Sequence, residues 1–187
     1  MSTIAPAAMQ SIGQRLQDQG IRVLDAPVSG GPTRAATGEL TIMIGGAEDL
    51  LAESREVLSA LGTHIIHIGP LGHGEMAKVA NNMIIGTLMP VLAEVLTLAA
   101  KMGADVEKVR EAIATSSGRN YLLDKWLPQT ILQNRYEGGF ALDLMLKDLH
   151  VALATARTLG VPMFATGLST QLFTQAQGLG YGRKDYS

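Results

Sequence analysis

Lys78, Asn81 and Asn82 are the polar residues of an otherwise apolar segment, and their types could carry proton-transfer chemistry. Lys78 and Asn82 stand four residues apart, so they share one face if the segment is helical. A lysine in apolar surroundings has a lowered pKa, and such an amine can exchange protons near neutral pH. The alternative is that Lys78 extends its ammonium group to water while the asparagines hydrogen-bond within the core. The spacing alone leaves both interpretations open.

A second candidate is the turn Ser29-Gly30-Gly31, which follows an apolar predicted strand. Two glycines let the backbone approach a ligand closely, and successive N–H groups in such a turn can bind an anion. The serine hydroxyl adds a hydrogen-bond donor. A plain tight turn without a ligand explains the same residues.

A third candidate is the dipeptide Lys147-Asp148, which lies among leucines in a predicted helix over residues 140–159. Phe140 is seven residues before Lys147 and is therefore expected on the same side of that helix. The alternative is a solvated ion pair on the outer face of the helix.

The chain lacks the residues that several other chemistries require. The chain has no cysteine, and His64 and His67 are three apart in a predicted strand, where they point to opposite faces, so we expect no metal site. Neither a nucleophile elbow nor a P-loop occurs. Gly178-Leu179-Gly180-Tyr181-Gly182 follows a predicted helix instead of a strand, which argues against a dinucleotide loop.

The composition is that of an ordinary soluble protein of 187 residues, 47% hydrophobic with a net charge of −2. We therefore expect no nucleic-acid partner. The absence of cysteine favours a cytoplasmic location, and the first residues lack the features of a signal peptide. Pro90 and Glu94 interrupt the longest apolar run, which favours a core helix over a membrane span.

The first part of the chain alternates strands and helices, as in an α/β sheet. Ser2 or Thr3 can cap a first helix that ends near Gly20, and a loop is expected after Pro32. The elements between are predicted strands over 21–28 and 39–44, a helix over 48–61 and a strand over 64–68. Since so small a sheet leaves a face and an edge bare, we expect a further strand before Met1.

From residue 72 onward only helices are predicted, over residues 73–101, 106–114, 122–132, 140–159 and 167–179. The first of them is apolar on every side, which predicts a buried helix. The boundary between the α/β part and the all-α part is therefore expected near residue 72.

Taken together and in order, these motifs resemble the β-hydroxyacid dehydrogenase family, which includes 3-hydroxyisobutyrate dehydrogenase, tartronate semialdehyde reductase and glyoxylate reductase. The motifs that carry the resemblance are the stretches 25–31, 38–46, 72–82, 147–149 and 184–187. The resemblance implies the end of a Rossmann-type NAD(P)-binding domain over residues 1–72. It implies an all-helical substrate and dimerisation domain over residues 73–187, headed by the long buried helix.

The resemblance also implies a role for each matching position. Lys78 would be the general acid/base, and the substrate-binding residues would be Ser29, Gly30, Gly31, Asn82, Phe140 and Asp148. Thr3 and Lys147 would contact the cofactor, which is NAD or NADP. The reaction would interconvert a small hydroxy acid and its semialdehyde by hydride transfer, in a homo-oligomer that is a dimer or tetramer. Such a lysine works near neutral pH because burial lowers its pKa.

The chain departs from the family pattern because no Gly-x-Gly-x-x-Gly turn is present. We therefore expect weak cofactor binding by the chain alone. Two alternatives follow. One is a non-catalytic helical oligomerisation fragment. The other is a dehydrogenase of phosphorylated sugar acids, for which only Arg34 and Arg119 are candidate phosphate ligands.

Overall fold

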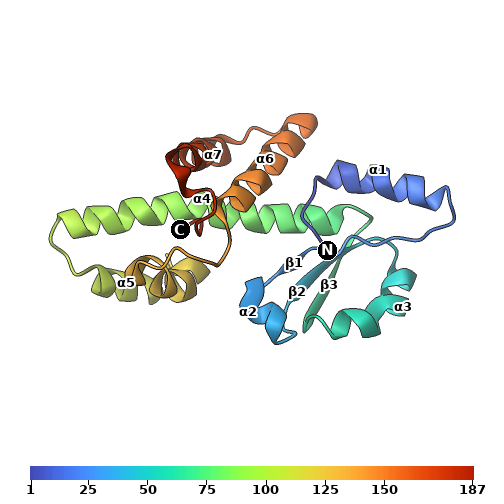
Figure 1. Cartoon of the computed structure of the whole chain (residues 1–187), viewed down its shortest axis with the longest axis horizontal. Helices are drawn as coiled ribbons and strands as arrows, with labels where there is room; N and C mark the ends of the chain where they lie inside the picture. The colour runs from blue at the N-terminus through green and yellow to red at the C-terminus, as the bar shows by residue number, and fades with distance from the viewer. The chain divides into compact units, whose positions relative to one another are not determined.

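The computed structural model describes all residues, Met1–Ser187, and divides into two compact units (Figure 1). The sheet unit comprises Met1–Met83 and Lys147–Met163, and the helical unit comprises Ile84–Leu146 and Phe164–Ser187. Helices α4 (His73–Lys101) and α6 (Leu142–Leu159) each contribute one end to each unit.

The sheet unit contains three strands in the order β1-β2-β3. Its elements before α4 are α1 (Pro6–Gln17), β1 (Val28–Ser29), α2 (Gly31–Ala36), β2 (Thr41–Gly45), α3 (Glu48–Ser59) and β3 (His64–Gly69). Strand β1 is antiparallel to β2, whereas β2 and β3 are parallel. Parallel neighbours need a crossover connection, and α3 supplies it. The predicted α/β class is therefore confirmed.

The core of the sheet unit lies on the α3 side of the sheet. Ile42 and Ile44 of β2 are fully buried, and they pack with Leu51 and Leu58 of α3. These leucines are seven residues apart and so share one helix face. The burial alternates along β2, as a half-buried strand requires.

The strand predicted over residues 21–28 is shorter in the structure. Only Asp25, which bridges to Gly45, and the two residues of β1 pair with β2. The loop predicted after Pro32 is wrong, because α2 occupies those residues. Proline at the second position of α2 is compatible with a helix, since its missing N–H needs no partner there.

The first helix begins at Pro6, and its N-cap is Ala5 without a side-chain cap. The predicted cap by Ser2 or Thr3 is therefore wrong. The reason is that the Thr3 carbonyl and the Ile4 N–H bond to side chains of other helices, which holds this segment extended.

The helical unit is built around α7 (Phe164–Ala176) and α5 (Val106–Ala114), together with parts of α4 and α6. The single helix predicted over residues 122–132 is instead three short turns, η1 (Leu122–Trp126), η2 (Leu127–Gln129) and η3 (Ile131–Gln133). Pro128 lacks the N–H that a continuous α-helix would use there. After α7, the last helical turn is η4 (Gln177–Tyr181).

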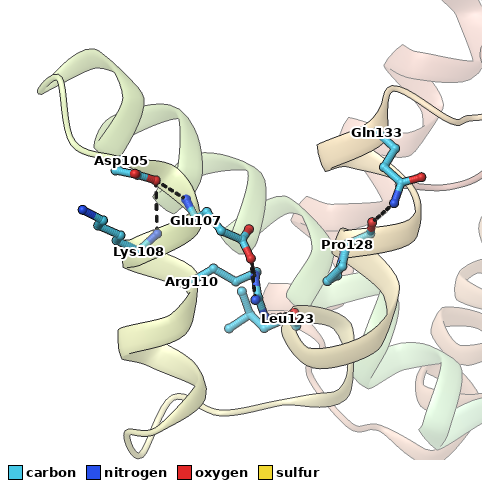
Figure 2. A network of polar contacts seen from close by, with 7 residues as sticks. All are labelled: Asp105, Glu107, Lys108, Arg110, Leu123, Pro128 and Gln133. Carbon is cyan, nitrogen blue, oxygen red and sulfur yellow. Dashed lines mark hydrogen bonds and ion pairs between the residues drawn. The ribbon is translucent and has the colours of Figure 1, made fainter.

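A surface network holds the start of α5 and connects it to η1 (Figure 2). Asp105 caps α5, because its Oδ1 accepts hydrogen bonds from the N–H groups of Glu107 and Lys108 at 3.0 and 3.2 Å. Arg110 binds the Glu107 carboxylate and donates to the carbonyl of Leu123 at 3.3 Å. This cap explains why α5 begins at Val106, as predicted.

Helix α4 runs over the predicted length, His73–Lys101, with Pro90 inside it. By length and composition alone it could cross a membrane, a test that core helices of soluble proteins also pass. The prediction of burial on every side is wrong for this chain. Ile84, Val91 and Leu98 are 67%, 48% and 65% exposed, and their spacing of seven places them on one stripe.

Candidate active site

Lys78 lies in the second turn of α4 and is partly buried. Burial lowers the pKa of Lys78, and the nearby Lys147 charge lowers it further, whereas Asp148 and Glu75 raise it. Desolvation is the largest of these effects, so the amine is easier to deprotonate than an exposed lysine. This is the property that a general acid/base needs near neutral pH.

Asn82, one turn further along α4, is buried and fixed on both sides of its amide. Its Nδ2 donates to Asp148 Oδ2 at 2.5 Å, and its Oδ1 accepts from Asn81 Nδ2 at 3.0 Å. One N–H of the Asn82 amide remains for a further acceptor, because an amide nitrogen has two. The amide is therefore oriented before any ligand arrives.

Asp148 of α6 is 2% exposed, so the interpretation of Lys147-Asp148 as a solvated pair is wrong for its acidic member. Its Oδ1 lies 2.7 Å from Lys147 Nζ. Lys147 also donates to the carbonyl oxygen of Thr3 at 2.7 Å. The structure thus joins Thr3, Lys147, Asp148 and Asn82, four of the predicted site residues, in one chain of contacts within the sheet unit.

Glu75 belongs to the same group and was not singled out from the sequence. It is 3% exposed, and its Oε2 accepts a hydrogen bond of 3.1 Å from the Ile4 N–H. Desolvation raises the pKa of this carboxyl above its ordinary value. An acidic residue three positions before Lys78 in an apolar helix was the available signal.

Asp25 is the second residue that the sequence did not single out. Its buried carboxylate accepts hydrogen bonds of 2.7 Å from the N–H groups of both Gly72 and Glu75. These are unpaired donors at the start of α4, so Asp25 caps that helix from a distant part of the chain. The capped turn lies directly before Lys78.

The turn Ser29-Gly30-Gly31 connects β1 to α2. Gly31 has a φ of 64° and Gly30 a φ of 142°, conformations that favour glycine. A Cβ on Gly30 would lie 2.8 Å from the Cβ of Arg34. The glycines are therefore needed for the turn itself, and the anion-binding role of this turn stays a prediction.

Phe140 does not lie in a helix, and the prediction that it shares a helix side with Lys147 is wrong. Helix α6 begins at Leu142, because the preceding residues pair with the end of the chain. The Phe140 N–H donates to Asp185 Oδ2 at 2.9 Å, and its ring packs edge-on against Tyr186. Phe140 belongs to the helical unit, so the structure does not group it with the residues around Lys78.

Two family models match nearly the whole chain. Residues 72–187 match the model described as NAD-binding of NADP-dependent 3-hydroxyisobutyrate dehydrogenase. The chain belongs to this family of β-hydroxyacid dehydrogenases. Residues 1–69 match the model described as the NAD binding domain of 6-phosphogluconate dehydrogenase. The predicted resemblance and fold class are confirmed, and both models are named for domains that bind NAD, the predicted class of cofactor.

Named relatives agree with this family of dehydrogenases. The chain is 38% identical to 2-(hydroxymethyl)glutarate dehydrogenase of Eubacterium barkeri, over 100% of the chain and 62% of that protein. It is 34% identical to human mitochondrial 3-hydroxyisobutyrate dehydrogenase, over 100% of the chain and 57% of that protein. The solved structure of Mycobacterium tuberculosis 3-hydroxyisobutyrate dehydrogenase with L-serine has a TM-score of 0.91 at 29% identity, covering 99% of the chain and 65% of that structure. The chain thus spans about three fifths of the length of these dehydrogenases.

Proposed function

We propose that the chain carries the substrate-binding and proton-transfer part of an NAD(P)-dependent dehydrogenase that interconverts a small β-hydroxy acid and its semialdehyde. The observation that carries this proposal is the pairing, on one face of α4, of an amine with a lowered pKa and a buried, oriented amide. The relatives named as hydroxy-acid dehydrogenases support the substrate class.

In the proposed reaction Lys78 exchanges the proton of the substrate hydroxyl. In the direction of oxidation the neutral amine of Lys78 accepts this proton, and in reduction the ammonium group returns it. The remaining N–H of Asn82 donates to the substrate oxygen and orients it toward Lys78. Asp148 holds that amide in place through the hydrogen bond from Asn82 Nδ2.

The nicotinamide cofactor, when bound, supplies the hydride acceptor or donor. The residues proposed to lie beside it are Thr3 and Lys147, whose contact fixes the carbonyl of Thr3. This donor set fits a nicotinamide site, because it presents an ordered peptide and a cation close to the helix of Lys78. Ser29, Gly30 and Gly31 are proposed to bind the substrate carboxylate, and a role for Phe140 in the site remains part of this proposal.

A specific observation favours a second candidate, the helical oligomerisation module. The exposed stripe of Ile84, Val91 and Leu98 on α4 is apolar surface that a second copy of the chain could bury. A homo-oligomer is compatible with both candidates. The phosphorylated sugar-acid alternative has less support, because Arg119 is paired with Asp124 at 2.7 Å.

Titration of the chain with NADH and NADPH, followed by assays with 3-hydroxyisobutyrate, 2-(hydroxymethyl)glutarate and L-serine, tests the proposal. We expect weak but saturable binding of one cofactor, because the chain has no Gly-x-Gly-x-x-Gly turn, and slow reduction of NAD⁺ or NADP⁺ with at least one hydroxy acid. A chain that assembles into oligomers but binds neither cofactor would refute the dehydrogenase and support the oligomerisation module. Sedimentation velocity on the same sample gives the oligomeric state.

A further inference from the structure

A single peptide group, the one between Thr3 and Ile4, is held at both of its ends by charged side chains. Its carbonyl oxygen accepts a hydrogen bond of 2.7 Å from the ammonium group of Lys147 on α6. Its N–H donates a hydrogen bond of 3.1 Å to the carboxylate of Glu75 on α4. The cation meets the negative end of the peptide dipole and the anion meets the positive end, so both contacts are charge-assisted hydrogen bonds.

We propose that Glu75 is a positioning residue that fixes the Thr3–Ile4 peptide against the first turns of α4. The consequence for cofactor placement rests on the proposed function, in which Thr3 lies beside the nicotinamide. Glu75 is itself not a reacting group in this proposal. It sets the position of a backbone segment that the cofactor would contact.

The burial of Glu75 supports this role. A carboxylate that is 3% exposed costs folding free energy unless a partner compensates it, and its hydrogen bond goes to the N–H of Ile4. The charged groups that face it are Asp25, Lys147, Lys78 and the amino group of Met1. A leucine or methionine at this position would continue the apolar character of α4 without such a cost.

The carboxylate of Glu75 also raises the pKa of Lys78, the candidate general acid/base. Glu75 lies three residues before Lys78 on α4, and its charge favours the protonated amine. Loss of the charge and loss of the hydrogen-bond acceptor therefore have separate effects. Glu75→Gln removes the charge and keeps an acceptor oxygen, whereas Glu75→Leu removes both.

Amide hydrogen exchange measured by NMR tests the proposal without any cofactor. In Glu75→Leu we expect exchange of the Ile4 N–H to accelerate about tenfold or more, because the bond that protects it is gone. In Glu75→Gln the acceleration should stay below about threefold, since the amide oxygen replaces the carboxylate. Lys147→Met releases the other end of the same peptide and should also accelerate the exchange of Ile4.

Glu94→Leu is the matched control, because it makes the same replacement at an exposed position of the same helix. Its Ile4 exchange should equal that of the wild type. Unchanged Ile4 exchange in Glu75→Leu would overturn the proposal, whatever Lys147→Met shows. If Glu75→Leu does not fold, Glu75→Ala decides by the same criterion, because it also removes the acceptor: faster Ile4 exchange supports the proposal and unchanged exchange overturns it. A chain that binds no NADH leaves this test intact, so the two proposals fail separately.

Discussion

Asp148 accepts a hydrogen bond of 2.5 Å from the side-chain amide of Asn82, although 66 residues separate them in the sequence. The contact joins α6 to α4 inside the sheet unit. Because Asp148 also pairs with Lys147, one buried carboxylate orients an amide and holds a cation. The predicted substrate and cofactor contacts are therefore coupled through this side chain.

Replacing Lys78 by alanine should lower kcat by a factor of about 10² to 10⁴ and leave cofactor affinity unchanged, because only proton transfer is removed. Steady-state kinetics and NADH titration measure the two effects. Lys101→Ala, at the exposed end of α4, is the control and should keep the wild-type kcat. Substantial turnover by Lys78→Ala would show that another group transfers the proton.

Asp148→Asn should lower the free energy of unfolding by about 1–3 kcal/mol, since a buried charge-assisted hydrogen bond is weakened. Urea unfolding measures the change. Asp49→Asn, at an exposed position in an ion pair with Arg22, should change stability by less than about 1 kcal/mol. Equal effects of the two substitutions would mean that the Asn82–Asp148 contact contributes no more than a surface pair.

The lowered pKa of Lys78 gives a stability difference that depends on pH. Between its lowered folded value and the unfolded value of 10.5, the unfolded chain binds more protons at this site. The contribution of Lys78 to the free energy of unfolding therefore rises with pH through this window. We expect the stability of the wild type relative to Lys78→Met to increase from pH 7 to pH 10 in urea unfolding. A stability difference between the wild type and Lys78→Met that does not change with pH would show that folding leaves the pKa of the amine unchanged.

Gly74→Ala should destabilise the sheet unit by about 1–3 kcal/mol. A Cβ on Gly74 would lie 2.5 Å from the Met43 carbonyl and 2.7 Å from the Asp25 carboxylate that caps α4. Gly167→Ala in α7 is the control, because a Cβ there meets nothing within 4 Å, and it should be neutral or slightly stabilising. Thermal unfolding of both variants checks the comparison, and a neutral Gly74→Ala would contradict the close contact.

The sequence predicts the elements that have a strong local signal. Asp105 marks the start of α5, and the apolar run of α4 gives its full length, because caps and periodicity are local properties. The short turns around Pro128 and the start of α6 after Phe140 were not predictable in the same way. They depend on contacts with residues far along the chain, such as the bonds of Asp185 to Phe140 and Trp126.

The same distinction applies to the candidate site. Lys78 and Asn82 could be found because their spacing on a helix is visible in the sequence. The acidic type of Glu75 in an apolar helix is a visible signal, but the roles of Glu75 and Asp25 could not be assigned, since their partners are backbone N–H groups. The exposed stripe on α4 shows the reverse error. Its apolar composition predicts that the side chains are buried, but composition does not say which part of a protein would cover them.

The cap that Asp25 provides has a consequence for engineering this dehydrogenase family. Asp25 lies four residues before Ser29 in the chain, and its carboxylate fastens the start of the lysine helix. If Ser29 binds the substrate carboxylate as proposed, this residue can be varied while Asp25 keeps the start of the lysine helix capped. On the proposed function, libraries that retain Asp25, Gly74 and the two turn glycines and randomise Ser29 would alter substrate choice separately from proton transfer.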